Sequence, residues 1–464
     1  MLKQFTKYVS QNMLGMLGMS LYILADTYFI SKAVGSNGIT ALNLVLPLYN
    51  LIFAIGAMIG VGSAIRFVIE RGKKNPDADG YFFHALSWAL IVGLLFMLVG
   101  IFFPDKLIAL LGGDAEIVAV GKNYTRIFLP DKLVALLGGD AEIIQTGTSY
   151  TRIFMCFSPF FMWNHICNAF VRNDKNPSIA MAATLFSSLF NIVFDYILMF
   201  PLGLAMKGAA LATGFSPVVG ILICCIHFFS RKSTIKLIPV LPSIKKLIYS
   251  CQVGVSAFVG EISSGVITVT FNMIILNLAG NTGVAAYGVV ANTSLVAVAL
   301  FNGIAQGSQP LISRSYGRGE EQNVRSLLKM ALTTALGLGV LLMIFIFFSA
   351  PAVTAVFNSE HDLQLAAYAD SGLRLYFIGF LFAGINIVGT AALSAVESVK
   401  YAFCASISRG FVATIFFAFV LSACFKMTGI WLAFPAAEFA TMFITLSGLL
   451  CFTKQKGGMY HAKD

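Results

Sequence analysis

The stretch FFHALSWALIVGLLFMLVGIFF, residues 82–103, contains no Asp, Glu, Lys or Arg. A helix of about 20 apolar residues is long enough to cross the ~30 Å hydrocarbon core of a bilayer. The stretch therefore predicts a transmembrane helix. Apolar runs of similar length recur along the whole chain. The sequence thus predicts an all-α, multi-pass membrane protein.

The composition supports this prediction. Of the 464 residues, 58% are hydrophobic and 11% are charged, and the mean hydropathy is +0.83. A soluble protein has about 25% charged residues. The net charge of +10 could suggest a nucleic-acid partner. We expect none, because the basic residues lie in short loops between apolar runs, as the positive-inside rule requires.

The cysteines and the N-terminus add no other class of protein. The eight cysteines lie in or beside apolar runs without metal-ligand spacing, so we expect small buried hydrophobic residues. The N-terminus has no short apolar stretch followed by a clear small-residue cleavage site. We therefore expect a retained helix and no signal peptide.

The apolar runs predict twelve spans, and the basic residues predict their orientation. Most of the 31 Lys and Arg residues, Arg409 among them, are assigned to loops on one side. That side should be cytoplasmic, which places both termini inside and the protein in a bacterial inner membrane. The spans are 9–30, 39–66, 82–103, 152–171, 178–200, 210–229, 251–278, 284–311, 327–349, 372–395, 401–424 and 430–452.

The chain also resembles two copies of one unit. Residues 62–73 align weakly with 307–318, and 104–126 with 351–374, at equivalent places in the two halves. Six spans per half predict parallel repeats, related by an axis along the membrane normal. We expect an N-terminal six-helix lobe at 1–230, a cytoplasmic linker at 231–250 and a C-terminal lobe with a short tail at 251–464.

A tandem repeat interrupts the first half. Residues 103–128 recur at once as 129–154, with 19 of 26 positions identical. Each copy is too charged and too short to span a bilayer. We expect one additional amphipathic helix on the outer side, which leaves twelve spans.

Acidic residues inside the spans are the strongest functional signal, because a charge at mid-bilayer usually faces a cavity or an ion path. Asp26 lies one helical turn after Tyr22, and Asp195 lies one turn after Asn191. Their oxygens suit an alkali cation, but two close carboxyl groups can instead share a proton. The alternative for each acid is a structural hydrogen bond.

Three further polar residues are weaker candidates. Glu261 is expected to hold a second cation or a cationic substrate, or else to join helices. Glu438 has the same alternatives. His165 is either a proton relay or a neutral, packed side chain.

At this point the sequence resembles the MATE (multidrug and toxic compound extrusion) transporters, in particular the MepA-like branch. The resemblance covers residues from about 8 to 453. It rests on ADTYFI (25–30), NIVFD (191–195), GLAMKGAALAT (203–213), NTGVAAYGVVAN (281–292) and GIAQGSQPLISRSYGRG (303–319).

The resemblance implies two six-helix lobes around a central cavity, and alternating-access antiport of organic cations against sodium ions or protons. It implies a cation site, possible for sodium, at Asp26, Asn191, Asp195 and Thr213, with Tyr22 nearby. One branch carries an acid that matches Glu261, paired with an aspartate on the tenth helix. Residues 372–395 contain no aspartate.

We therefore expect a monomeric efflux antiporter in the lipid bilayer, with small cationic, amphipathic substrates and no cofactor besides the coupling ion. The alternative is a flippase or exporter of lipid-linked or other small molecules, which would need several basic residues within the spans. An ion channel is disfavoured by the two-lobe repeat. A membrane enzyme is disfavoured because the five histidines are scattered, with no nucleophile–base pair or metal cluster.

Overall fold

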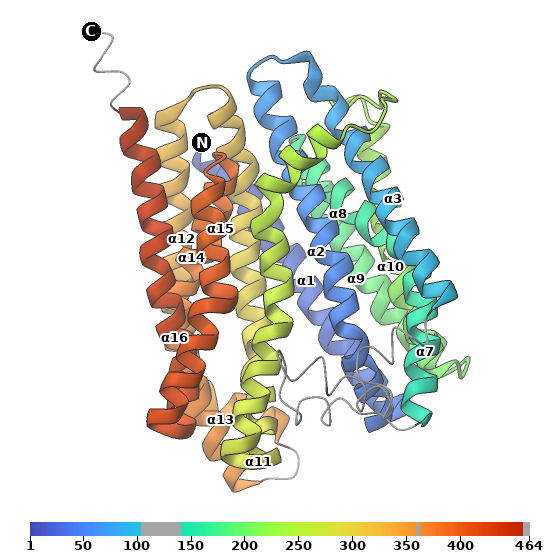
Figure 1. Cartoon of the computed structure of the whole chain (residues 1–464), viewed down its shortest axis with the longest axis vertical. Helices are drawn as coiled ribbons and strands as arrows, with labels where there is room; N and C mark the ends of the chain where they lie inside the picture. The colour runs from blue at the N-terminus through green and yellow to red at the C-terminus, as the bar shows by residue number, and fades with distance from the viewer. Residues whose placement is uncertain (104–140, 359–361, 458–464) are drawn as a thin grey trace, which may run out of the picture. The chain divides into compact units, whose positions relative to one another are not determined.

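The computed structural model describes residues 1–103, 141–358 and 362–457. Every regular element within these ranges is helical, and they contain no strand (Figure 1). The prediction of an all-α fold is therefore confirmed. The physical reason is that a helix satisfies its backbone N–H and C=O groups internally, which the hydrocarbon core requires.

The first half of the chain folds into long helices joined by short turns. Asn176 begins one of them, because its side-chain oxygen accepts a hydrogen bond from the Ile179 N–H and Pro177 follows at the first helical position. The helices are α1 (Leu2–Val34), α2 (Ser36–Gly72), α3 (Tyr81–Phe102), α7 (Ala141–Cys156), α8 (Ser158–Asn173), α9 (Pro177–Met199) and α10 (Ala205–Phe228).

The second half contains two long helical stretches that are sharply bent. Gly280, with φ 63°, interrupts α11, and Lys426, with φ 52°, interrupts α16. A π-helical turn, Ser408–Val412, joins α15 to α16. The helices are α11 (Ile244–Gly317), α12 (Glu321–Phe357), α13 (Leu363–Tyr376), α14 (Phe380–Ala395), α15 (Val399–Ile407) and α16 (Ala413–Gly457).

These helices accommodate the predicted spans. Among the described residues, nine helical stretches are long and apolar enough to cross a membrane. Two of them, Ile244–Gly317 and Val399–Thr453, each contain two predicted spans on either side of a bend. The predicted span 152–171 is divided between α7 and α8, which have 16 residues each.

One basic residue was assigned to the wrong place. Arg409, counted with the cytoplasmic loops, lies within the stretch Val399–Thr453, in the π-helical turn. A helix rises 1.5 Å per residue, so Arg409 is about 15 Å along the helix from Val399. A single arginine in an apolar run can mark a loop or a buried partner, and the sequence does not distinguish the two.

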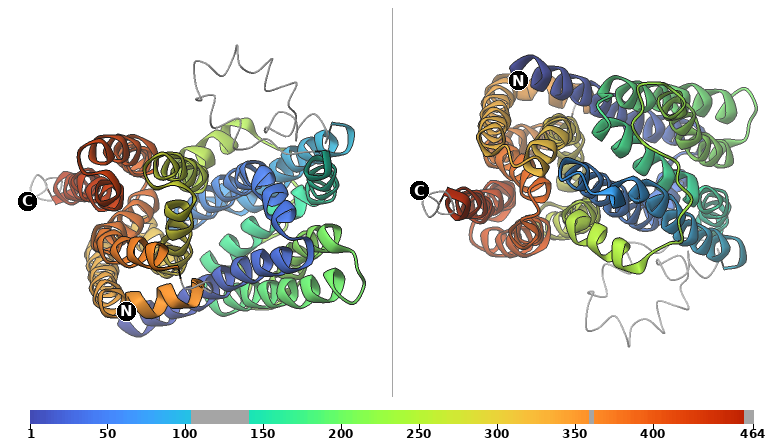
Figure 2. Two further views of the ribbon diagram at one scale, coloured as in Figure 1. Left: turned by 90° about the horizontal axis from the view of Figure 1, so that it is seen from below. Right: turned by 90° about the horizontal axis from the view of Figure 1, so that it is seen from above.

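Contacts divide the chain into two compact units. Unit 1 comprises Met1–Leu17, Gly62–Asp79 and Ile248–Asp464, and unit 2 comprises Gly18–Val61 and Gly80–Leu247. Figure 2 shows the helices nearly end-on, and within each unit they pack as a bundle. The lobe boundaries predicted from the repeat, 1–230 and 251–464, stay a prediction.

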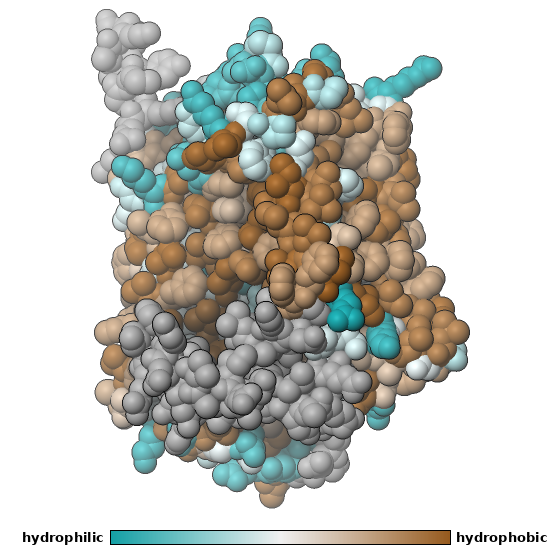
Figure 3. Space-filling view, turned by 45° about the vertical axis from the view of Figure 1, so that its right-hand side comes forward, coloured by the Kyte–Doolittle hydropathy of each residue, from teal (hydrophilic) through white to brown (hydrophobic). Residues whose placement is uncertain are grey.

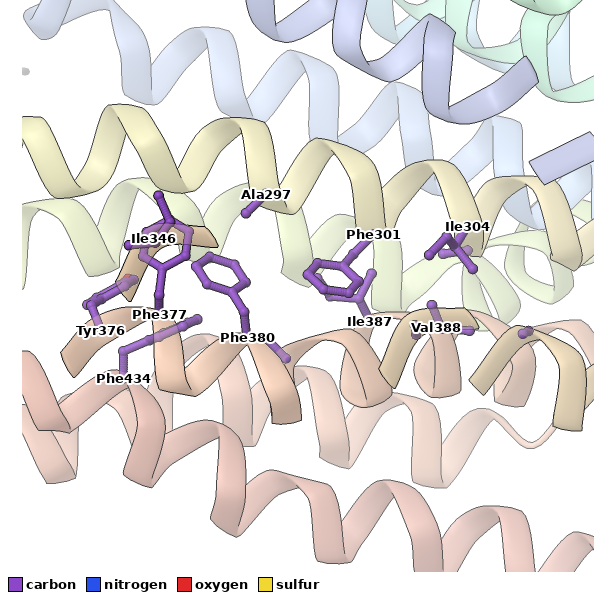
Figure 4. Close-up of a cluster of buried hydrophobic side chains, with 14 of the residues drawn as sticks. Ala297, Phe301, Ile304, Ile346, Tyr376, Phe377, Phe380, Ile387, Val388 and Phe434 are labelled. Carbon is purple, nitrogen blue, oxygen red and sulfur yellow. The ribbon is translucent and has the colours of Figure 1, made fainter. Parts of the chain in front are cut away.

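Aromatic side chains fill the core of unit 1 (Figure 4). The rings of Tyr376 and Phe434 stack with centroids 4.2 Å apart, and those of Phe301 and Phe380 stack at 6.0 Å. Such pairs stabilise a core beyond the apolar area that they bury. They fix α11, α13, α14 and α16 against one another.

Close backbone contact joins α1 to α11 in unit 1. A Cβ atom on Gly303 would lie 2.5 Å from the Met13 Cα, and one on Gly307 would lie 2.7 Å from the Val9 Cα. Only glycine fits at such distances. This small-xxx-small spacing is a common packing device of membrane helices.

Large apolar side chains cover the outside of the helices. On the face shown in Figure 3, hydrophobic residues form a broad band, and hydrophilic residues gather toward the helix ends. On α12, Leu341, Phe345 and Phe348 are 66%, 62% and 78% exposed. Exposure of this extent is expected where lipid replaces water as the solvent. The protein is therefore a multi-pass membrane protein.

Candidate functional site

The two acids predicted to form a site meet in unit 2. Asp26 lies on α1 and Asp195 on α9, and their carboxyl groups interact directly with each other. Asp195 is fully buried. Apart from this contact, no donor among the described residues reaches the Oδ1 atom of either acid. Carboxylates only accept hydrogen bonds, so the pair requires a shared proton or a bound cation.

Asn191 lies beside Asp195, and Thr213 lies beside Asn191. Asn191 is fully buried on α9, one turn before Asp195. With its amide oriented to satisfy both ends, Asn191 donates to Asp195 Oδ2 at 3.1 Å and accepts from the Thr213 N–H at 3.3 Å. Ala209 on α10 and Ala183 on α9 are both fully buried.

Three tyrosines surround these groups, and the sequence analysis identified only one of them. The hydroxyls of Tyr22 and Tyr49 lie 3.1 Å apart. Tyr150, on α7, is 2% exposed, hydrogen-bonds to the Thr213 side chain and interacts electrostatically with both acids. The signal for Tyr49 and Tyr150 was a hydroxyl in or beside an apolar run, which is too common to single them out.

Tyr150 belongs to the second tandem copy, 129–154. The first copy lies almost entirely outside the described residues, which resume at residue 141. Residues 141–154 belong to α7, and Thr151 and Phe154 are fully buried there. The expectation of one additional outer amphipathic helix stays a prediction, because most of the repeat lies outside the described residues. Positions 150, 151 and 154 share one helix face and are buried in the unit.

The remaining candidates lie elsewhere. His165 of unit 2 packs edge-on against Phe53 at 4.9 Å, and its buried Nε2 has no hydrogen-bond partner among the described residues. Glu261 and Glu438 belong to unit 1. Glu261 is exposed, whereas the Glu438 side chain is 2% exposed and pairs with Arg409.

The site can do one kind of chemistry. It gathers two carboxyl groups, an amide oxygen and hydroxyl groups from α1, α7, α9 and α10, all oxygen donors that suit an alkali cation. The described residues contain no group of three or more His, Cys, Asp or Glu that could hold a metal ion. The geometry therefore fits one monovalent cation or one proton.

Comparisons with known proteins identify the family of the chain. A model of the MatE family matches residues 12–131, 125–197 and 257–420. The first two segments overlap at the junction of the tandem copies. Among curated proteins, the chain is 25% identical to the multidrug export protein MepA of Staphylococcus saprophyticus over 429 residues, which cover 92% of this chain and 88% of that protein. MepA of Staphylococcus aureus strain MRSA252 is 25% identical, with the same shares covered.

Solved structures share the fold. An outward-facing multidrug resistance MATE transporter superposes with a TM-score of 0.86 at 21% identity, covering 98% of this chain and 96% of that one. A transporter of the same superfamily from Pyrococcus furiosus, described as having a binding pocket of reversed polarity, superposes with a TM-score of 0.81 at 21% identity, covering 98% and 95%.

Proposed function

Since the chain belongs to the MatE family, we propose that it is a secondary antiporter that exports small organic cations in exchange for sodium ions or protons. The observation that carries this proposal is the contact between Asp26 and Asp195 inside unit 2. The curated relatives are named as multidrug export proteins, which supports the substrate class.

The acid pair supplies the coupling. Two adjacent carboxylates in a low-dielectric site repel each other, and a single positive charge relieves that repulsion. A proton would be shared between the two carboxyl groups. A sodium ion would also take the oxygens of Asn191 and Thr213. In either case the site gains one positive charge from one side of the membrane and loses it on the other.

In an alternating-access cycle, binding and release of the coupling cation would drive export of the drug. The conformation that binds the coupling cation more tightly is favoured when the cation is bound, and the drug must be bound better in the other conformation. The coupling free energy is the difference between the cation affinities of the two states. Apolar contacts and acidic residues such as Glu261 would hold an organic cation on the cytoplasmic side.

The first test is ethidium efflux from proteoliposomes, with an imposed sodium gradient and, separately, an imposed proton gradient. Wild-type protein should follow one of the two gradients, which identifies the ion. Asp26→Asn should reduce gradient-driven efflux by at least tenfold, because an amide cannot offer the same charge. Asp77→Asn, at an exposed position in the short 3-10 helix Pro76–Gly80 before α3, is the matched control and should leave efflux unchanged. Equal efflux by wild type and Asp26→Asn contradicts the proposal.

A flippase for lipid-linked molecules is the alternative. It would need several basic side chains within the spans to hold a pyrophosphate. Among the described residues that were assigned to loops, Arg409 lies well inside a helical stretch that could cross a membrane. The organic-cation antiporter therefore remains the proposed function.

We also propose that both termini are cytoplasmic, as the loop charges predict. The start of α1 and the end of α16 both belong to unit 1 and lie toward the same end of it (Figure 1). A fluorescent protein fused to the C-terminus should fold and fluoresce in cells, and an alkaline phosphatase fused there should be inactive. The reverse result contradicts this orientation.

A further inference from the structure

The chain between α10 and α11, residues 229–243, is the longest stretch among the described residues that forms no helix. This α10–α11 connection has the sequence FSRKSTIKLIPVLPS and belongs to unit 2. It is the yellow-green segment that runs from the end of α10 to the start of α11 in the right-hand view of Figure 2. No Asp or Glu occurs between Asp195 and Glu261, so the whole connection carries only positive charge.

Hydrogen bonds hold the α10–α11 connection on unit 2 near both of its ends. Asp174, buried at the end of α8, accepts one hydrogen bond from the Thr234 N–H at 2.7 Å and another from the Thr234 hydroxyl. The Ser243 N–H donates to Nδ1 of the buried His84, near the start of α3, at 3.2 Å. Ile235, between these two points in the sequence, is buried. The connection is therefore fixed against the ends of α8 and α3.

Several large apolar side chains of the α10–α11 connection are exposed. Phe229 is 83% exposed and Leu241 is 90% exposed, and Leu237 is exposed as well. Exposed apolar surface of this kind marks an interaction site with a protein or a membrane. Pro239 and Pro242 have no backbone N–H, which leaves fewer donors to satisfy where water is scarce. The connection is therefore suited to partly apolar surroundings.

The exposed apolar side chains continue the lipid-facing surface of α10. Leu222 and Ile226 are exposed on α10, within the stretch Ala205–Phe228 that could cross a membrane. Ile226 follows Leu222 by four positions and Phe229 follows Ile226 by three, so the three side chains lie on one side of the helix. Helix α3, to which the far end of the connection is bonded, also has an exposed apolar side chain at Leu95. The connection therefore joins and contacts helices that border lipid.

Positive charge accompanies this apolar surface. Arg231, Lys232 and Lys236 are exposed in the α10–α11 connection. Lys175 is exposed directly after Asp174, the acid that holds the connection. Lysine and arginine next to exposed apolar side chains are typical of segments that lie on anionic membrane surfaces.

We propose that the α10–α11 connection lies in the headgroup region of the membrane leaflet at its end of unit 2, where it binds anionic phospholipids. Leu237 and Leu241 enter the boundary between headgroups and acyl chains. Arg231, Lys232 and Lys236 bind the lipid phosphate groups. In the orientation proposed above, this leaflet is the cytoplasmic one.

A lipid surface fits these observations better than a soluble protein partner does. A protein would have to cover an apolar surface that continues from the side of α10 where lipid chains already lie. Anionic phospholipids supply an apolar component and a negative charge together. The inference is independent of the transported substrate and of the coupling ion.

Tryptophan fluorescence in lipid nanodiscs tests the inference. Leu241→Trp is introduced into the full-length protein, and the signal of the three native tryptophans is subtracted with the wild type in the same nanodiscs. The nanodiscs contain a constant mixture of phosphatidylglycerol and phosphatidylcholine. One of the two lipids carries bromine near the headgroup end of its acyl chains, which quenches a tryptophan only on contact.

Bromine on either lipid should quench the added tryptophan. Bromine on phosphatidylglycerol should quench it about twofold more strongly, because the basic side chains enrich that lipid at the connection. Absence of quenching by both lipids means that Leu241 faces water or a protein and overturns the inference. Equal quenching by the two lipids also overturns it, because the anionic headgroup then has no role.

The decisive variant adds Arg231→Gln, Lys232→Gln and Lys236→Gln to Leu241→Trp. It should lose the preference for brominated phosphatidylglycerol and keep the quenching by brominated phosphatidylcholine. A preference that persists overturns the inference. The matched control neutralises three exposed basic residues of unit 1 and should keep the preference; they are Arg318, Lys329 and Lys400. Loss of the preference in both variants shows a general effect of charge and overturns the inference.

Phe229→Trp is the second reporter, in case Leu241→Trp does not fold. It exchanges one aromatic side chain for another at an exposed position and should show the same lipid preference. The measurement needs neither an ion gradient nor a substrate. Expected quenching in a protein without gradient-driven efflux contradicts only the antiport, and efflux without quenching contradicts only the lipid contact.

Discussion

At the residue scale, function depends on polar groups that are buried without a full set of protein partners. Asp26 and Asp195 lie against each other, and the Oδ1 atom of each receives no hydrogen bond from a protein donor among the described residues. No protein cation in this part of the chain neutralises the two acids. Arg409 and Glu438 illustrate the opposite arrangement, in which the acid is fully paired. The two acids without a neighbouring protein cation are therefore the ones proposed to exchange a cation with solution.

Tyr150→Phe should weaken binding of the coupling ion about fivefold. The substitution keeps the ring but removes the hydroxyl that is bonded to Thr213, and one hydrogen bond contributes about 1 kcal/mol. The dependence of efflux rate on sodium or proton concentration measures the effect. Tyr28→Phe, at a 57% exposed position on α1, is the control and should have no effect. An unchanged ion dependence of Tyr150→Phe would remove Tyr150 from the site.

At the element scale, helices are positioned by close contacts and by hydrogen bonds of buried polar side chains at their ends. Asp174, at the end of α8, is such a side chain and is 4% exposed. Its Oδ2 lies 2.9 Å from His227 Nε2 on α10 and accepts a hydrogen bond from the Thr234 N–H at 2.7 Å. Because Thr234 lies in the predicted linker 231–250, its hydrogen bond to Asp174 holds the start of that linker on unit 2.

Asp174→Asn should lower the free energy of unfolding by about 2 kcal/mol at pH 7, because charge-assisted hydrogen bonds are lost. Burial opposes ionisation, but the hydrogen bonds from His227 and Thr234 outweigh it and lower the pKa of Asp174 below 3.8. A lowered folded-state pKa stabilises the protein above the unfolded-state pKa, and this contribution is lost as the pH falls through the folded-state value.

Thermal unfolding of the two proteins between pH 7 and pH 3 measures this effect. The difference in unfolding temperature between wild type and Asp174→Asn should stay constant down to about pH 5. It should narrow only below the pKa that Asp174 has in the unfolded state. Asp77→Asn should show no difference at any pH. A difference that grows as the pH falls would contradict the ionised state of Asp174.

Gly307→Leu should prevent correct packing of α11 on α1. The new side chain would enter space occupied by the Val9 backbone, and overpacking of this kind costs about 1–3 kcal/mol or more. A lower yield of folded protein and a lower unfolding temperature are expected. Gly337→Leu, where a Cβ atom would meet nothing within 4 Å, is the matched control. Equal stability of both variants would contradict close packing at Gly307.

At the scale of the whole molecule, the tandem repeat is the feature that separates this chain from the family pattern. The second copy ends in α7, which contributes Tyr150 to the candidate site. The first copy carries the same YTRIF sequence at 124–128, but the chain can lead into α8 only from the second.

Deleting residues 103–128 should therefore leave gradient-driven ethidium efflux within about twofold of the wild type. The deletion joins Phe102 to Leu129 and keeps one complete copy before α8. Insertions in surface loops usually cost little free energy, so their removal should also cost little. The matched deletion of 129–154 joins Phe128 to Met155 and places the first copy in the same position, so it should behave alike. Loss of efflux in both would show that the pair of copies is required.

The sequence by itself determined the class of the protein and the centre of its candidate site. A run such as 82–103 can satisfy its backbone in lipid only as a helix, so apolar length was sufficient to predict the spans. Asp26, Asn191 and Asp195 were identified because charged or amide groups in apolar helices are costly and therefore stand out, whereas Thr213 was named only by the family resemblance.

Only the tertiary structure decided which polar groups meet. Tyr150 was not singled out, and Arg409 was assigned to a loop, because a sequence shows local polarity but not the partner that comes from a distant helix. Glu438 follows Arg409 by 29 positions and Asn386 by 52, and their contact depends on the packing of α14, the π-helical turn and α16. Exposure to lipid determines the apolar pattern of each helix separately. Side-chain contacts between helices depend on how the helices pack, and the apolar pattern does not determine that packing.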